Sequence, residues 1–223
     1  MDLTFSSEIT IIAMKQLVIL VIFLFLTACS SAPPIPQIPS LPTTDTTTPA
    51  KRLHLHLCPM KVSNAPQTSN GRVLRASALA CLNNIELLIN PAPGACLSSG
   101  FGNNGRKHRG LDYHQRPASH VVAASDGIIK TLTYRKKDFG NWIVIEHGSG
   151  VYTAYGHLAK VNNNLRVGHF VKQGQTLGIM GKTGAEASGV HLHFEVRKGH
   201  YQNRKGWWGL TAVDPFQLPA QCH

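Results

Sequence analysis

The 223-residue sequence predicts a mainly β fold, an antiparallel sheet domain with a narrow groove over residues 96–222. From Cys96 onward, short runs rich in β-branched and aromatic residues, such as NWIVIEHG and VHLHFEVR, alternate with Gly, Asn and Asp. No helical periodicity of apolar residues is visible from Ser98 to the C-terminus. The absence of helical patterns between the expected strands argues against an alternating α/β fold.

Residues 1–28 have the features of an export signal. A basic start at Met14 is followed by an apolar run over residues 17–26 and by the small-residue ending LTAC at Cys29. The apolar run is shorter than the roughly 20 residues that a membrane-spanning helix needs. The LTAC ending resembles a bacterial lipobox, which predicts cleavage before Cys29 and its lipidation. Residues 1–13 contain acidic and polar residues that fit poorly before a signal, so translation is expected to begin at Met14.

Residues 29–50 consist mainly of Pro, Ser and Thr with hardly a charge, which predicts an extended tether without a core of its own. The chain has a formal net charge of +11, and loss of residues 1–28 removes more acidic than basic residues. A basic surface favours anionic partners. In an exported protein this favours an acidic cell envelope over nucleic acid, with the membrane reached through a lipid anchor at Cys29.

Residues 51–95 are expected to form a small, partly helical segment before the β domain. Apolar residues between Val73 and Ile89, in RVLRASALACLNNIELLIN, recur mostly at steps of three and four. This spacing predicts one amphipathic helix. Packing on the following domain is the favoured role for that helix, and a regulatory pro-segment is the alternative.

Four cysteines remain besides Cys29, and an even number in an oxidising compartment predicts two disulfides with three possible connectivities. Cys96 and Cys222 flank the predicted β domain. A bond between Cys96 and Cys222 is therefore the expected clasp. The remaining pair, Cys58 and Cys81, follows by elimination.

Two short motifs can each present metal-binding side chains on one face of an extended segment. His191 and His193 are two residues apart, so in a strand both imidazoles point to the same face while Leu192 points to the other. His108 and Asp112 are four residues apart and share a face in the same way. Two imidazoles and one carboxylate suit Zn²⁺, and three protein ligands leave a fourth position for water.

A third motif, YGHL at His157, completes a resemblance. The segments HRGLDY, NWIVIEHGSGVYTAYGHL and GKTGAEASGVHLHFEVR, in this order, resemble the successive motifs of the lysostaphin or LytM family of zinc endopeptidases. The resemblance implies that His108, Asp112 and His193 bind one zinc ion. It also implies that His191 and His157 are the catalytic pair. His191 is the expected base and His157 the expected oxyanion stabiliser, and the reverse assignment remains open.

The implied function is hydrolysis of peptide cross-links in bacterial peptidoglycan. The target is either a bond between D-Ala and diaminopimelate or a glycine bridge in the stem peptides. By resemblance, the lipobox and tether suggest an outer-membrane lipoprotein that faces the periplasm, with envelope regulatory proteins as further partners. The rival interpretation is a non-catalytic LytM-like protein that activates or recruits cell-wall amidases. Such members typically lack several ligands, and this chain lacks none.

Three other patterns are interpreted as structural. GFGNNG at residues 100–105 satisfies the glycine pattern of a dinucleotide site, but no strand precedes it and no helix follows, so it is expected to be a turn. GKTGAEASG at residues 181–189 lacks the first glycine of a phosphate loop and is expected to form a groove wall. His54 and His56 have no nearby carboxylate and are expected to be exposed.

Overall fold

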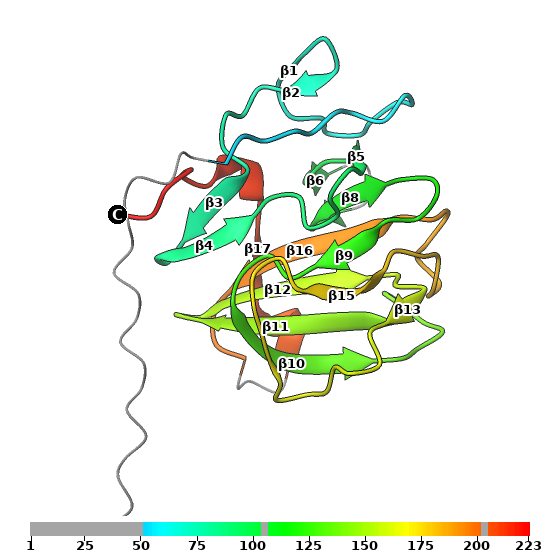
Figure 1. The fold of residues 1–223 in the computed structure, drawn as a ribbon, viewed down its shortest axis with the longest axis vertical. Helices are drawn as coiled ribbons and strands as arrows, with labels where there is room; N and C mark the ends of the chain where they lie inside the picture. Colours follow the sequence, from blue (N-terminus) through cyan, green and yellow to red (C-terminus); the bar gives the residue numbers. More distant parts are fainter. Residues whose placement is uncertain (1–50, 104–106, 202–204) are drawn as a thin grey trace, which may run out of the picture. The chain divides into compact units, whose positions relative to one another are not determined.

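The computed structural model describes residues 51–103, 107–201 and 205–223 (Figure 1). The chain divides into two units, Met1–Thr48 and Pro49–His223, and all described residues belong to the second. The expected signal over residues 1–28, the lipidated Cys29 and the tether over residues 29–50 lie outside the described residues. Within the described part, no helix is both long and apolar enough to span a membrane.

An eight-stranded antiparallel sheet is the largest element of the second unit. Its strands are β5 (Cys96–Ser99), β8 (Leu111–His114), β10 (Gly127–Thr133), β11 (Trp142–Gly148), β12 (Val151–Gly156), β14 (Phe170–Val171), β16 (Leu192–Lys198) and β17 (Thr211–Val213). They follow the order β14-β10-β11-β12-β16-β8-β5, and β17 also pairs with β16. Every pairing is antiparallel. The predicted mainly β, antiparallel fold is therefore confirmed.

A smaller sheet covers one face of the large one. Its strands are β9 (His120–Val122), β13 (Lys160–Val161) and β15 (Thr176–Ile179), in the order β13-β15-β9 (Figure 1). Val121 and Leu177 of the small sheet share one hydrophobic core with Ile145 and Phe194 of the large sheet, and all four are fully buried. This core makes the large sheet a rigid support for whatever lies on its opposite face.

The opposite face of the large sheet carries polar and aromatic residues. Along β16, Leu192, Phe194 and Val196 belong to the main core, whereas the residues between them point away from it. A second apolar cluster, which includes Trp142 and Trp207, lies on this side. Two short 3₁₀ helices, η1 (Gly206–Gly209) and η2 (Pro215–Gln217), flank β17. The functional side chains described below lie on this face.

The helix predicted between Val73 and Ile89 is wrong, because this region forms β-hairpins. The N-terminal strands are β1 (Thr68–Ser69), β2 (Arg72–Val73), β3 (Leu79–Leu82) and β4 (Ile85–Leu88). Asn83 and Asn84 form a two-residue turn with φ of 49° and 63°, a backbone region that Asn tolerates. The turn joins two short strands. Across it, the apolar residues of the two strands recur at steps of three and four, the spacing that predicts a helix. The described residues contain no α-helix.

The structure contains two disulfides, as predicted, but both predicted pairings are wrong. The bonds are Cys58–Cys96 and Cys81–Cys222. The N-terminal segment runs beside the edge strand β5, where the backbone N–H of Cys58 donates to Leu97 O (2.9 Å). The C-terminus returns to β3, where the N–H of Cys81 donates to Pro219 O (2.8 Å). The positions of the cysteines along the chain do not reveal which segment lies beside β5 and which lies beside β3. The sequence therefore could not give the disulfide connectivity.

Candidate metal centre

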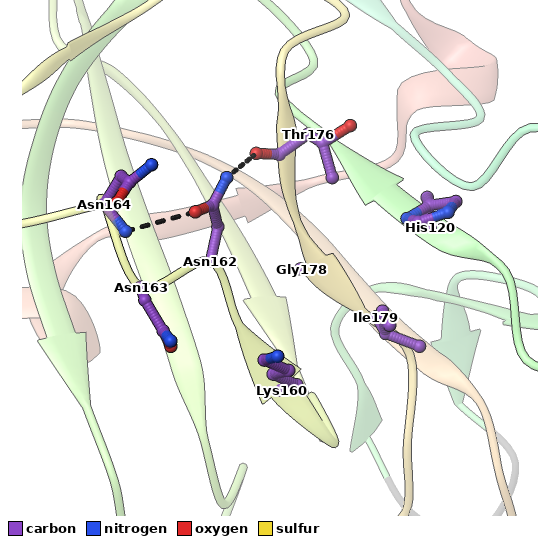
Figure 2. Close-up of a pocket in the computed structure, with 8 residues that line it drawn as sticks. All are labelled: His120, Lys160, Asn162, Asn163, Asn164, Thr176, Gly178 and Ile179. Atoms are coloured by element: carbon purple, nitrogen blue, oxygen red, sulfur yellow. Dashed lines mark hydrogen bonds between the residues drawn. The ribbon is translucent and has the colours of Figure 1, made fainter.

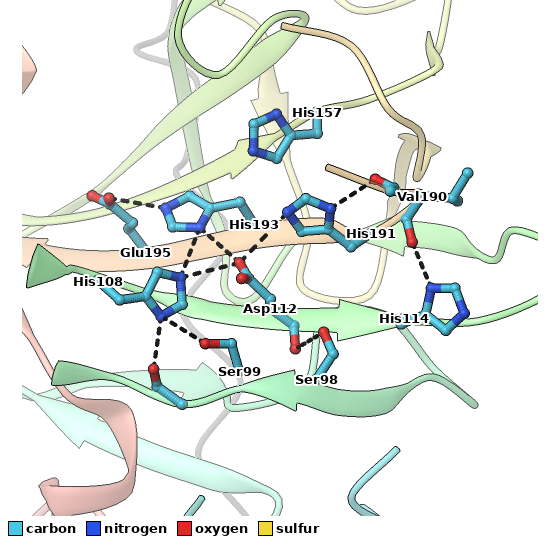
Figure 3. A network of polar contacts seen from close by, with 12 residues as sticks. Ser98, Ser99, His108, Asp112, His114, His157, Val190, His191, His193 and Glu195 are labelled. Atoms are coloured by element: carbon cyan, nitrogen blue, oxygen red, sulfur yellow. Dashed lines mark hydrogen bonds and ion pairs between the residues drawn. The ribbon is translucent and has the colours of Figure 1, made fainter. Parts of the chain in front are cut away.

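The pairing of β8 with β16 brings two of the predicted ligands face to face. The register places His193 directly opposite Asp112, and both side chains point to the outer face of the sheet (Figure 3). His108 ends β7 (Lys107–His108), which pairs with β6 (Gly102–Asn103), and reaches the same point from the side. Gly110 allows this approach, because a Cβ there would lie 2.4 Å from Phe194 O.

The three predicted ligands converge on one point. Asp112 Oδ1 lies 2.8 Å from His193 Nδ1 and 3.2 Å from His108 Nε2, and the two ring nitrogens are 3.3 Å apart. Tetrahedral Zn²⁺ with bonds of about 2.0–2.1 Å requires ligand atoms roughly 3.3 Å apart. Among the described residues, this is the group whose His and carboxylate atoms lie close enough together to hold one ion. The donor set and its spacing therefore fit zinc.

The electrostatics of the ligand cluster favour a cation. Burial opposes ionisation of Asp112, but hydrogen bonds from His108 and His193 outweigh it and hold the pKa of that carboxyl well below its usual range. Burial also lowers the pKa of His193, but hydrogen bonds with Asp112 and Glu195 outweigh it and raise that pKa to about 10. A metal ion that binds His193 Nδ1 must therefore displace a proton.

Glu195 and Arg197 continue the row of side chains that begins at His193. Glu195 Oε1 lies 3.0 Å from His193 Nε2, and its Oε2 accepts a hydrogen bond from Arg197 Nε. Both side chains are almost fully buried, and Arg197 also donates to the carbonyl oxygens of Trp207 and Leu210. The sequence analysis missed this pair. The period-two alternation of HLHFEVR, which places His191 and His193 on one face, could have revealed it.

The predicted catalytic histidines lie side by side next to the ligands, with ring centroids 4.6 Å apart. His157 Nδ1 donates to Thr183 O (2.8 Å), and His191 Nδ1 donates to Gly189 O (2.9 Å), because a carbonyl oxygen can only accept. Burial, with a smaller contribution from the neighbouring His191, lowers the pKa of His157 to about 4. In the neutral ring of His157, Nε2 is therefore an unprotonated acceptor.

The comparisons with known proteins agree with this arrangement. Residues 106–205 match the model of Peptidase family M23. The chain carries an M23 peptidase domain. The matched range includes all five residues that the structure brings together, which are His108, Asp112, His157, His191 and His193.

Three curated relatives resemble part of the chain. "DD-carboxypeptidase/endopeptidase Mpg" of Neisseria meningitidis is 35% identical over 116 residues, which are 49% of this chain and 26% of that protein. "Peptidoglycan DD-endopeptidase ShyC" of Vibrio cholerae is 38% identical over 90 residues, 40% of this chain and 20% of that protein. "Lipoprotein NlpD/LppB homolog" of Pseudomonas aeruginosa is 33% identical over 127 residues, which are 57% of this chain and 38% of that protein. The matches therefore span between 20% and 38% of these relatives' lengths.

Two solved structures are similar to part of the chain. The catalytic domain of lysostaphin from Staphylococcus simulans is 32% identical, with a TM-score of 0.44, and covers 52% of this chain and 86% of that chain. A mutant catalytic domain of the M23 protein EnpA from Enterococcus faecalis is 23% identical, with a TM-score of 0.49. The match covers 56% of this chain and 92% of that chain.

In this M23 domain, His108 is linked through Gly100 to the N-terminal segment. His108 Nδ1 donates to Gly100 O (2.7 Å), and the N–H of Gly100 donates to Ser63 O (2.7 Å). A Cβ at Gly100 would lie only 1.9 Å from Asn64 O, so the two backbones approach too closely for any larger residue. The segment that contains Ser63 is bonded to β5 by the disulfide of Cys58. It therefore contributes to the placement of a predicted ligand.

The candidate metal site of the M23 domain lies in a groove of about 710 Å³. Phe139 and Trp208 form aromatic walls, and residues 185–188 form another wall, as predicted for the GKTGAEASG segment. None of the described residues 51–95 lines this groove. The two rejected histidines, His54 and His56, are exposed as expected.

A separate hollow of about 390 Å³ lies on the small sheet (Figure 2). Asn162 lines it; its Oδ1 accepts from the N–H of Asn164 and its Nδ2 donates to Thr176 O. These bonds fix the loop that forms the hollow. The hollow has no cluster of metal-binding residues, so the candidate site of the M23 domain is the groove on the large sheet.

Proposed function

We propose that this protein is a zinc-dependent endopeptidase that hydrolyses peptide cross-links of bacterial peptidoglycan. The observation that carries the proposal is the convergence of His108, Asp112 and His193 beside the histidine pair in an open groove. Zn²⁺ held by the three ligands would polarise the scissile carbonyl and lower the pKa of a bound water toward about 7. The five residues together meet the requirements for hydrolysis at neutral pH.

The two catalytic histidines have the same hydrogen-bonding pattern. His157 Nδ1 and His191 Nδ1 each donate to a backbone carbonyl, so in either neutral ring Nε2 is the atom that can take a proton from the attacking water. A ring that has taken this proton can then donate a hydrogen bond to the developing oxyanion. We keep the assignment expected from the sequence, with His191 as the base and His157 as the oxyanion stabiliser, and the reverse as the alternative.

The names of two curated relatives support a DD-endopeptidase that acts on peptidoglycan. We therefore propose the bond between D-Ala and diaminopimelate as the substrate, with a glycine bridge as the alternative. Phe139 and Trp208 in the walls of the groove can contact the stem peptides.

The proposed location is the outer membrane, facing the periplasm, with a lipid anchor at Cys29. The LTAC ending and the relative named as a lipoprotein support the anchor. The two disulfides support export, because such bonds persist in oxidising compartments. Envelope proteins that regulate the enzyme are further proposed partners.

The competing function is a non-catalytic activator of amidases. Metal analysis of the purified full chain, combined with the release of soluble peptides from purified sacculi, distinguishes the two. The endopeptidase should contain one zinc ion per chain and release cross-linked fragments, and a chelator should stop the release. An activator would release nothing alone and would stimulate an added amidase.

A further inference from the structure

The groove continues beyond the metal centre into a second hollow of about 530 Å³. We call it the Arg116 hollow. It shares Asp112, Ser188 and His191 with the metal-centre groove, so the two spaces meet at the edge of the ligand cluster. Its own walls include Met60, Ser98, His114, Arg116 and Val190. A peptide that reacts at the metal centre can therefore extend into this hollow on one side of the scissile bond.

Most polar side chains of the Arg116 hollow already have partners within the protein. His114 Nδ1 donates to Val190 O (2.6 Å), and Ser98 Oγ donates to Asp112 O (3.1 Å), as Figure 3 shows. These bonds fasten β8 to β5 and to the segment before β16. They make the walls rigid, and Nδ1 of His114 and the hydroxyl proton of Ser98 are already committed.

Arg116 differs from the other residues that line this hollow. Its side chain is exposed and makes no hydrogen bond or ion pair with another described residue. The other formal charge in the lining is the carboxylate of Asp112, which faces the other two predicted ligands, His108 and His193. The hollow thus presents one unpaired guanidinium, and the planar fork of a guanidinium matches a carboxylate with two parallel hydrogen bonds.

Met60 gives the hollow an apolar side. It is 59% exposed, although a methionine in a folded protein is usually buried. Its segment is fastened at Cys58, which forms the disulfide to Cys96 and whose carbonyl accepts from the N–H of Met60 (2.7 Å). Met60 lies outside the range that matches the M23 family, so it is a feature of this chain's N-terminal segment.

On the other side of the ligand cluster, the metal-centre groove presents exposed charges of both signs. Arg109 and Glu186 both line it and are both exposed, so a cation and an anion are present together. Glu195 is paired with His193 and Arg197. Among the described residues that line the two spaces, the Arg116 hollow is therefore the side that offers a bound peptide an exposed cation without an exposed anion beside it.

We propose that the Arg116 hollow is a substrate-binding site that takes a peptide residue with an aliphatic stem and a free carboxylate. Arg116 binds the carboxylate, and Met60 contacts the aliphatic part of the same peptide residue. This inference rests on the proposed function, because stem peptides carry free carboxylates beside their cross-links. It makes Arg116 a determinant of specificity and of the direction in which the peptide lies.

The test uses two soluble cross-linked muropeptides that differ only in whether the stem carboxylates are free or amidated. The full-length wild-type protein, Arg116→Gln and the control Arg135→Gln are compared on both. Arg135 is exposed and lines neither hollow. Wild type should prefer the free carboxylates. Arg116→Gln should lose about tenfold in kcat/KM on that substrate, mainly through KM, with little change on the amidated one. Its zinc content should equal that of wild type.

Loss of the preference in Arg116→Gln, with Arg135→Gln unchanged, supports the proposal. It is overturned if wild type cleaves both substrates equally well, or if Arg116→Gln slows both by the same factor. Failure of wild type to cleave either substrate is a different result, because it refutes the peptidase function itself.

Discussion

His193 Nε2 and Glu195 Oε1 lie 3.0 Å apart on the same face of β16, in a buried contact. Because Nε2 donates to the carboxylate, Nδ1 is the ring atom left to face Asp112 and His108. Glu195 is in turn held by Arg197. The orientation of a predicted ligand thus depends on a carboxylate that does not itself reach the metal position.

The first prediction concerns this carboxylate. Glu195→Ala should weaken zinc binding by about 10- to 100-fold, because His193 loses the acceptor that orients its ring. Glu195→Gln keeps an acceptor oxygen and should retain much of the affinity. The affinity is measured by competition with a chromophoric chelator, with Glu86→Ala on the exposed side of β4 as the control. Equal affinities in wild type and Glu195→Ala would show that Glu195 has no positioning role.

The second prediction concerns Gly100, whose carbonyl accepts from His108. In Gly100→Ala, the new Cβ would lie 1.9 Å from Asn64 O, so the backbone must move and take the acceptor with it. Zinc affinity should fall, and the free energy of unfolding should drop by about 1–3 kcal/mol. Gly168→Ala is the control, because its φ of +87° strains an alanine but its Cβ meets no atom within 4 Å. Unchanged zinc affinity in Gly100→Ala would contradict the predicted link.

The third prediction concerns pH. Burial lowers the pKa of His147 to about 4, and its two ring nitrogens contact Asp126 O and Thr153 Oγ1, each at 2.7 Å. The unfolded chain binds a proton at this ring below about pH 6.5, whereas the folded protein does not until about pH 4. His147 should therefore make no pH-dependent contribution to the free energy of unfolding above pH 6.5, and it should lower that free energy by up to about 3 kcal/mol between pH 6.5 and 4.

Urea unfolding at several pH values measures this loss, and NMR titration of the ring measures its pKa directly. His147→Asn should reduce the slope below pH 6.5, while the exposed His169→Asn should not. A folded-state pKa of His147 near 6.5 would be incompatible with the predicted mechanism.

The sequence could predict the fold and the ligand cluster because both depend on local alternation. In a strand, residues two apart share a face, so HLHFEVR indicates both the core side and the site side of β16. Pairing with β8 then requires only that Asp112 lie on the matching face, which the alternation of LDYH provides.

The parts that could not be predicted depend on long-range pairing. The turn at Asn83 makes two short strands resemble one helix in apolar spacing, and only the pairing of Leu82 with Ile85 separates the two structures. The disulfides depend on which segment lies beside β5 and which lies beside β3. The contact between Gly100 and Ser63 has the same origin, since the residues are 37 positions apart and adjacent only through the sheet edge.

The most direct test of the central claim is the zinc content and sacculus hydrolysis of five alanine variants. His108→Ala, Asp112→Ala and His193→Ala should lose zinc and activity together, because each removes one of three protein ligands. His157→Ala and His191→Ala should keep most of the zinc while the rate falls by roughly 100-fold or more. Zinc retained in His193→Ala but lost in His191→Ala would reverse the assignment of ligand and catalytic residue, and full activity in all five variants would contradict the peptidase function.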